Sequence, residues 1–195
     1  FSDGGAMSGV VTVSATQFPW PELLSLLAVL TMTLGNLVAI QQMSIKRMLA
    51  YSSIAHAGYM LLAMPVMSSD SIYAIMIYLV MYLFMNLGAF FVVIIVKNKT
   101  GGESFDDYKG LGWEMPFVGA AMTLFMVSLT GLPPTAGFIG KFYIFAALMK
   151  GGGAYYWLVL AGGINSVISL YYYLRVVKVM YFDGERKDKI LLPSK

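Results

Sequence analysis

Lys141 lies inside a strongly apolar part of the sequence, residues 116–149, where a charged side chain is unexpected. It follows TGLPPTAGFIG, a stretch rich in proline and glycine. A lysine at the centre of a membrane span costs roughly 2.5 to 3.5 kcal/mol on insertion scales, so such residues are functional candidates. Because burial disfavours the charged form of an amine, Lys141 is a candidate for reversible protonation.

The prolines and glycines before Lys141 predict a break in the helix that carries it. Proline removes a backbone donor and clashes with the preceding turn, and glycine allows backbone conformations closed to other residues. A straight helix over residues 116–149 would measure about 51 Å, against about 30 Å for a hydrocarbon core. We expect two half-helices joined by unwound backbone. The hinge residues would be Gly131, Pro133, Pro134, Gly137 and Gly140.

Two interpretations of Lys141 follow. In the first, the half-helices flank a hydrated cavity, and Lys141 exchanges protons at the start of the second half-helix. The positive end of the helix dipole would there add to burial in disfavouring the charged amine. In the second, Lys141 snorkels towards the membrane surface, and the prolines and glycines only bend an overlong helix.

His56, the only histidine in the sequence, lies within the segment IKRMLAYSSIAHAGYMLLA. Histidine changes its charge between about pH 5 and 8, so a proton relay is one interpretation. Ser52 and Tyr59 lie at i−4 and i+3 from His56 and share its helix face. Polar side chains also tie membrane helices together, which is the other interpretation of His56 and the one that we adopt for Ser52 and Tyr59.

Polar residues recur at helical spacing in two further apolar segments. One series is Tyr78, Tyr82 and Asn86, and the other is Asn165, Ser169 and Tyr173. Each series falls on one helix face, and we interpret both as helix-packing residues. Their hydroxyls and amides, with those of Ser52 and Tyr59, could instead hold a chain of waters.

Three acids, Glu103, Asp106 and Asp107, fall in a polar segment between apolar ones. We interpret them as solvated loop residues. Contact with a neighbouring subunit is the alternative.

Composition places the chain among integral membrane proteins. Hydrophobic residues make up 58% and charged residues 12% of its 195 residues, whereas a soluble domain carries roughly a quarter charged residues. The net charge is only +3, and no basic stripe with interleaved aromatics suggests nucleic-acid binding. Cysteine is absent from the sequence, so cysteine usage indicates neither a redox compartment nor a thiolate metal site.

Five apolar segments predict an all-α, polytopic transmembrane helix bundle. We expect residues 1–195 to form a single transmembrane domain with spans at 23–40, 48–67, 72–96, 116–149 (broken) and 155–180.

Lysine and arginine are concentrated on one side of this predicted bundle. The connections on that side hold Lys46, Arg47, Lys97, Lys99, Lys109, Arg186, Lys187, Lys189 and Lys195. The two connections on the other side hold only Lys150. By the positive-inside rule the basic side is cytoplasmic, and the chain begins outside.

Four segments of the sequence together resemble a known family. They are GNLVAIQQMSIKRMLAYSSIAHAGYMLL, YLFMNLGAFFVVIIV, SLTGLPPTAGFIGKFYIFAAL and SVISLYYYLRVVKVMYF. In this order and spacing they resemble the antiporter-like membrane subunits of proton-pumping NADH:quinone oxidoreductase, respiratory complex I. The likeness is to subunit N, called subunit 2 in mitochondria and B in the chloroplast relative.

The resemblance implies a conformationally coupled proton pump. In this family two inverted half-repeats each hold a broken helix, and buried lysines with a glutamate form a hydrated axis at the membrane midplane. Residues 116–149 would be the broken helix of the second repeat. Lys141 would then pass a proton towards the outer exit, and His56 would border the same half-channel. The resemblance further implies that this chain is the C-terminal part of a subunit more than twice its length.

The same resemblance sets expectations for cofactors, partners and location. We expect no redox cofactor in this chain, whereas flavin, iron–sulfur clusters and quinone would belong to partner subunits of the oxidoreductase. The partners would be antiporter-like subunit M, small membrane subunits and the lipid bilayer. The expected location is a bacterial inner membrane, with an organelle inner membrane or the thylakoid as alternatives.

Two other functions stay open. One is a subunit of a multi-subunit sodium/proton antiporter, which would work without electron-transfer partners. The other is a non-transporting membrane scaffold, in which Lys141 pairs with an acid from a neighbouring helix.

Overall fold

The computed structural model describes residues 18–183, and within them the regular structure is helical. The long helices are α1 (Trp20–Ile40), α2 (Ile45–Leu62), α3 (Ser69–Thr100), α5 (Pro116–Thr130), α6 (Ala136–Lys150) and α7 (Tyr156–Tyr181). The short ones are α4 (Leu111–Glu114) and the 3₁₀ helices η1 (Met64–Val66), η2 (Phe105–Tyr108) and η3 (Gly153–Tyr155).

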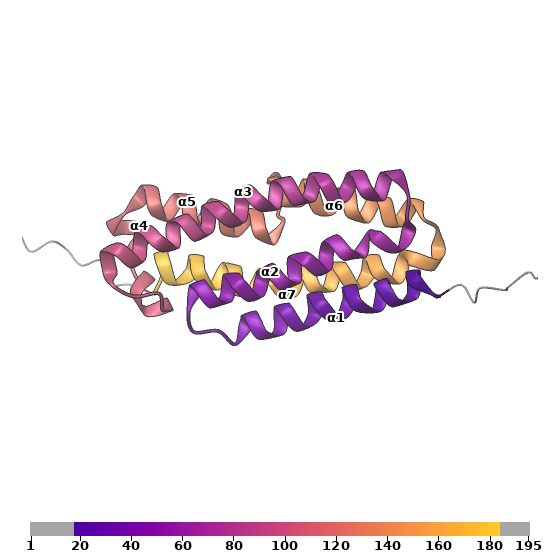
Figure 1. Ribbon diagram of the computed structural model, residues 1–195. Coiled ribbons are helices and arrows are strands. Elements are labelled where there is room, and N and C mark those ends of the chain that lie inside the picture. The colour runs from indigo at the N-terminus through magenta and orange to yellow at the C-terminus, as the bar shows by residue number, and fades with distance from the viewer. Residues whose placement is uncertain (1–17, 184–195) are drawn as a thin grey trace, which may run out of the picture.

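The helices form an elongated bundle (Figure 1). α3 runs along most of its length and contacts both α5 and α6, which lie one after the other beside it. α1 packs against α2 and α7 along the opposite edge of the bundle. The two half-helices therefore rest on one continuous helix; α7 also packs against both of them, and α2 packs against α6.

Among residues 18–183, four helical segments are long and apolar enough to cross a membrane, namely Trp20–Ile40, Ile45–Val66, Ser69–Thr100 and Gly153–Tyr181. α5 and α6 have 15 residues each, so neither reaches across a core of about 30 Å alone. The short helices over Phe105–Glu114 turn away from α5 by 119°. The predicted all-α bundle with one broken span is confirmed. The span limits and the orientation in the membrane stay predictions.

α1 and α2 approach each other at backbone distance. A Cβ atom added to Gly35 would lie 2.6 Å from the backbone nitrogen of Ala55, and one added to Gly58 would lie 2.6 Å from that of Met32. Small residues permit this approach, which membrane helices use because lipid supplies no hydrophobic drive to association. The two helices therefore pack as one tight hairpin.

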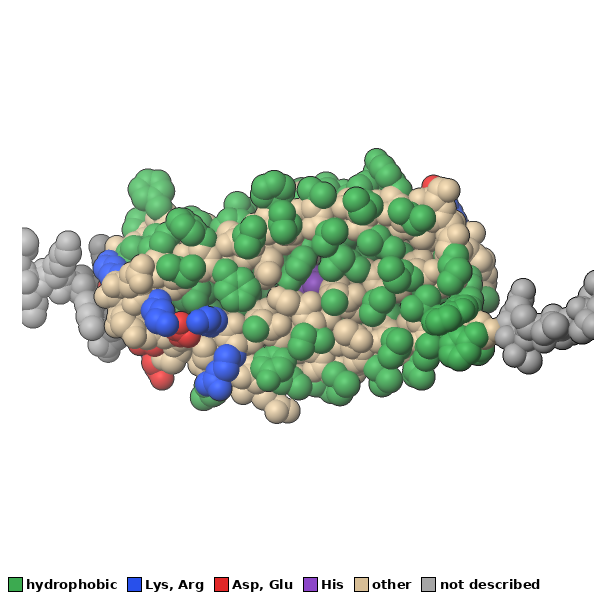
Figure 2. Space-filling model, in the orientation of Figure 1, with side chains coloured by type: hydrophobic (Ala, Val, Ile, Leu, Met, Phe, Trp, Pro, Cys, Tyr) green, Lys and Arg blue, Asp and Glu red, His purple; other side chains and the backbone are tan. Residues whose placement is uncertain are grey.

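Polar contacts join the loops at one end of the bundle. Glu103 accepts from Lys97 at 2.7 Å and from Lys46 at 3.4 Å, which connects the start of α2 to the end of α3. The hydrogen bond from Lys97 holds the pKa of Glu103 below its ordinary value. Glu103 is therefore ion-paired as well as solvated, and the charged side chains of this face gather mainly at this end (Figure 2).

Candidate functional site

The break between α5 and α6 frees two backbone carbonyls. α5 ends at Thr130, and Gly131 follows with a φ of 85°, a left-handed conformation that favours glycine. In a continuous helix, the carbonyls of Leu129 and Thr130 would accept from the residues four positions later. Those residues are Pro133 and Pro134, which have no N–H. The prolines thus leave acceptors at the end of α5.

The Lys141 amine takes one of these acceptors. Its Nζ donates to the Thr130 carbonyl oxygen at 2.7 Å and to the Ser166 hydroxyl at 2.9 Å, and it lies 4.6 Å from the centre of the Tyr59 ring. The side chain is 4% exposed. Lys141 forms no ion pair with any residue between 18 and 183. All its described partners are electrically neutral.

The position of the amine differs from the one expected from the helix dipole. Lys141 belongs to α6, but its side chain reaches back to the C-terminal end of α5. The carbonyl end of a helix carries partial negative charge, so this end stabilises the ammonium group. The position of Lys141 in α6 predicts an influence from the positive end of that helix, whereas the contact that the amine makes is with the negative end of α5.

The predicted hinge glycines have different roles. Only Gly131 has a positive φ. A Cβ atom at Gly137 would overlap the Ser128 carbonyl oxygen, and one at Gly140 would lie 2.6 Å from the Tyr78 ring. Gly137 and Gly140 thus let α6 pack closely against α5 and α3, which is a matter of space and not of backbone conformation.

His56 bridges two tyrosines from other helices. Its Nδ1 lies 2.6 Å from the Tyr78 hydroxyl of α3, and its Nε2 lies 3.0 Å from the Tyr173 hydroxyl of α7. The ring is buried, with 2% of the residue exposed. A neutral imidazole has one donor and one acceptor nitrogen, so one tyrosine donates to His56 and the other accepts from it. This arrangement is a directional hydrogen-bonded chain across three helices.

The remaining predicted polar residues divide into two sets. The Tyr59 ring lies near both titratable groups, 4.6 Å from Lys141 Nζ and 6.0 Å from the centre of the His56 ring. The Tyr82 ring stacks on His56 at 4.8 Å. By contrast, Ser52 donates to the carbonyl of Leu49 in its own helix.

Two buried polar atoms near this site have no partner among the described residues. They are the Tyr82 hydroxyl and the Oδ1 atom of Asn86. Asn165 contacts Asn36 and Thr33 of α1 and so joins α1 to α7. Its role in packing, which the spacing suggested, agrees with this geometry.

Sequence reasoning missed the direct partners of Lys141. Ser166 follows Asn165, which was singled out, but nothing in the periodicity distinguished it. Thr130 could have been found, because Pro134 stands four residues after it and removes its helical donor. Between residues 18 and 183, no cluster of three or more His, Cys, Asp or Glu side chains could hold a metal ion.

Together these features define a polytopic membrane protein with a broken helix and a buried lysine beside the break. The transmembrane family described as NADH:quinone oxidoreductase/Mrp antiporter matches residues 6–169. The chain belongs to this family, and it is an integral membrane protein.

Named relatives agree with the resemblance to subunit N. The chain is 56% identical to NADH-quinone oxidoreductase subunit N 2 of Sorangium cellulosum, over 97% of this chain and 37% of that protein. It is 45% identical to NAD(P)H-quinone oxidoreductase subunit 2, chloroplastic, of Chaetosphaeridium globosum, over 88% of this chain and 35% of the relative. The chain thus spans about a third of the length of these relatives.

Solved structures share the fold. A chain of respiratory complex I from Thermus thermophilus with bound aureothin matches with a TM-score of 0.72 and 36% identity, over 85% of this chain and 37% of that one. A chain of the Mrp complex from Dietzia sp. matches with a TM-score of 0.76, over 87% of this chain and 31% of that one. The latter is 23% identical, which shows likeness of fold alone.

Proposed function

We propose that this chain is part of a proton-translocating membrane subunit of an NADH:quinone oxidoreductase. The names of its relatives support the oxidoreductase. The observation that carries proton translocation is the buried amine of Lys141, held at a helix break by a carbonyl, a hydroxyl and an aromatic ring. No described carboxylate fixes its charge.

In this proposal Lys141 accepts and releases the transported proton. The protonated amine donates to Thr130 and Ser166 and lies over the face of Tyr59, which attracts a cation. Because these partners are neutral, the amine can lose its proton without leaving an unpaired acid beside it. The helix break places this exchange between two half-helices, where backbone that is not helical is tolerated if it faces protein or water.

His56 would act as a second relay group in the same interior. A proton that arrives at one ring nitrogen can leave from the other, and each nitrogen contacts a tyrosine hydroxyl. Tyr59 lies near both this group and Lys141. Tyr78 and Tyr173 are thereby proposed as relay partners, and Tyr82 as the stacking residue that orients the ring.

Electrons would travel elsewhere in the complex. We propose that flavin, iron–sulfur clusters and quinone lie in partner subunits, and that the neighbours include antiporter-like subunit M and small membrane subunits. Quinone reduction and proton movement would then be coupled by conformational change. The likeness to the Mrp complex supports the common fold and does not by itself favour sodium/proton antiport.

The test uses the full-length subunit in the assembled complex, with proton movement in vesicles normalised to assembled protein. Lys141→Ala should lose most pumping, and quinone reduction should fall with it. Lys141→Arg should also pump poorly, because guanidinium keeps its charge in this pH range. Lys150→Ala, at an exposed lysine paired with Asp70, is the matched control and should pump normally.

Near-normal pumping by both Lys141 variants would contradict the proposal and favour a scaffold or packing role. Purification of the tagged subunit gives a separate answer. Flavin and iron–sulfur proteins should copurify with it, and their absence from an active transporter would favour the antiporter.

A further inference from the structure

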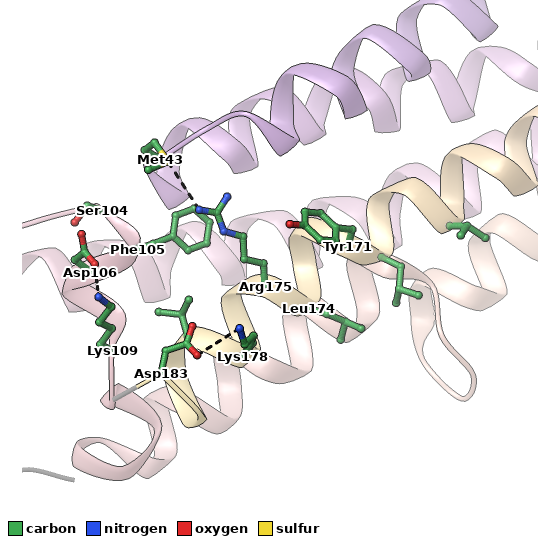
Figure 3. A pocket seen from close by; sticks show the side chains of 13 residues that line it. Met43, Ser104, Phe105, Asp106, Lys109, Tyr171, Leu174, Arg175, Lys178 and Asp183 are labelled. Atoms are coloured by element: carbon green, nitrogen blue, oxygen red, sulfur yellow. Dashed lines mark hydrogen bonds and ion pairs between the residues drawn. The ribbon is translucent and has the colours of Figure 1, made fainter. Parts of the chain in front are cut away.

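A cavity of about 740 Å³ lies outside the proposed proton site, at the end of the bundle that carries the basic loops (Figure 3). α7 forms one wall, and the 3₁₀ helix η2 with the α1–α2 turn at Met43 forms the other. Its lining combines charged side chains at one end with apolar side chains of α7 at the other. This polarity matches that of a lipid molecule.

The charged part of the cavity holds three cations and two acids. Lys109 pairs with Asp106 at 2.6 Å, and Lys178 pairs with Asp183 at 3.5 Å. Arg175 has no carboxylate partner between residues 18 and 183. The lining therefore carries one uncompensated positive charge, located at Arg175.

Arg175 also has unused donors. Its guanidinium lies 4.2 Å from the centre of the Phe105 ring, and one nitrogen lies 3.8 Å from the Met43 sulfur. A ring face and a thioether are weak partners for a group with five N–H donors. Phe105 and Met43 thus hold the guanidinium in place and leave it free to bind a phosphate through two parallel hydrogen bonds.

An apolar stripe continues from Arg175 towards the middle of α7. Val167, Leu170, Tyr171 and Leu174 line the same cavity, and their spacing places them on one face of the helix. Val167 is 69% exposed and Tyr171 is 62% exposed. The stripe extends about 12 Å along the helix from Arg175, at 1.5 Å per residue.

We propose that this cavity binds an anionic phospholipid, with its phosphate on Arg175 and Lys178 and an acyl chain along the apolar stripe of α7. Charge complementarity selects the headgroup, because basic pockets at the membrane surface attract anionic lipids. The stripe selects a lipid over a free phosphate, which would gain nothing from exposed apolar side chains. This inference does not depend on the proposed proton pathway.

The experiment uses the purified complex with the full-length subunit and a phosphatidylglycerol that carries a photoreactive group on its acyl chain. After irradiation, mass spectrometry should find the lipid attached within residues 167–174. Unlabelled phosphatidylglycerol should suppress this labelling at about tenfold lower concentration than phosphatidylcholine with the same acyl chains. Equal suppression by the two lipids would overturn the proposal, even without a variant.

The double variant Arg175→Gln and Lys178→Gln should reduce labelling by about tenfold or more, with assembly intact. Lys99→Gln removes a charge from α3 outside the cavity lining and should label normally. Unchanged labelling of the double variant would overturn the proposal. A photoreactive amino acid at Val167 provides a second test: capture of a protein segment there, and not of lipid, would assign the cavity to protein packing.

Discussion

The chain uses lysine in two different environments. Lys46, Lys97, Lys109, Lys150 and Lys178 lie at the ends of the bundle, and each contacts a carboxylate. Lys141 lies in the interior and contacts a carbonyl, a hydroxyl and a ring. The surface lysines have counter-charges that favour the protonated, charged state. The partners of Lys141 are dipoles only, which stabilise the ammonium form but do not require Lys141 to stay charged.

This difference teaches where charge can change and where it is fixed. An acid beside a buried amine would favour the ionised form of both groups, because neutralising one of them leaves the charge of the other unpaired. Neutral partners impose no such penalty. The interior of the bundle is therefore suited to a variable charge, and its loop end to a constant one.

The largest effect is expected when the packing between the half-helices α5 and α6 is disturbed. Gly137→Ala places a Cβ atom against the Ser128 carbonyl oxygen. Overpacking of this kind costs about 1 to 3 kcal/mol, and the clashing atom is backbone. We expect most of the assembled complex to be lost, as measured by native gel electrophoresis of membranes.

Gly163→Ala is the matched control for Gly137→Ala. An added Cβ atom at Gly163 of α7 meets nothing within 4 Å, so assembly should be unchanged. Equal assembly of the two variants would mean that the contact between the half-helices is loose, and the contrast between interior and surface would weaken.

His56 tests whether the interior carries protons beyond Lys141. His56→Ala should lower pumping by about tenfold or more, since it removes a group that accepts and donates protons. His56→Gln should keep part of the activity, because an amide holds hydrogen bonds but does not titrate. Vesicle pumping per assembled complex is the measurement. Normal pumping by both variants with loosened assembly would make His56 a packing residue.

Ser166 tests whether pumping depends on the neutral hydrogen-bond partners of the Lys141 amine. Ser166→Ala removes one acceptor of Lys141 and leaves the Thr130 carbonyl, so pumping should fall by about fivefold, the factor for about 1 kcal/mol, with assembly intact. Ser169→Ala is the control, because that hydroxyl donates to a carbonyl of its own helix. If Ser166→Ala pumped as well as Ser169→Ala, Ser166 would have no role in the site.

The smallest effect is expected at the loop end. Lys97 lowers the pKa of Glu103 below its ordinary value of 4.5. A lowered pKa means that the ion pair stabilises the folded loop at neutral pH and that this contribution is lost as the pH falls below about 4.5. The protection of residues 101–108 against hydrogen exchange, measured relative to the intrinsic exchange rate at each pH, should therefore fall slightly on acidification. Glu103→Gln should remove this pH dependence and leave pumping near normal.

Sequence reasoning reached the class of fold, the break and the buried lysine, because each rests on local chemistry. The length of an apolar segment predicts a membrane helix, and prolines such as Pro133 and Pro134 interrupt a helix whatever packs around it. The partners of Lys141 and His56 could not be predicted from local chemistry. Which face of α3 or α7 meets α2 depends on packing between helices, so Tyr78 and Tyr173 were recognised as polar but not as neighbours of His56.

The Thr130 carbonyl has a second donor close to it. It accepts from Lys141 at 2.7 Å, and the Ser166 hydroxyl lies 3.4 Å from the same oxygen. When the lysine side chain rotates away, an abandoned buried carbonyl would cost about 1 to 3 kcal/mol. Ser166 is placed to take over that acceptor, so the departing amine leaves no orphaned group behind. In the proposed pump, the helix break thus supplies an acceptor that Lys141 could leave without a buried carbonyl losing its only donor.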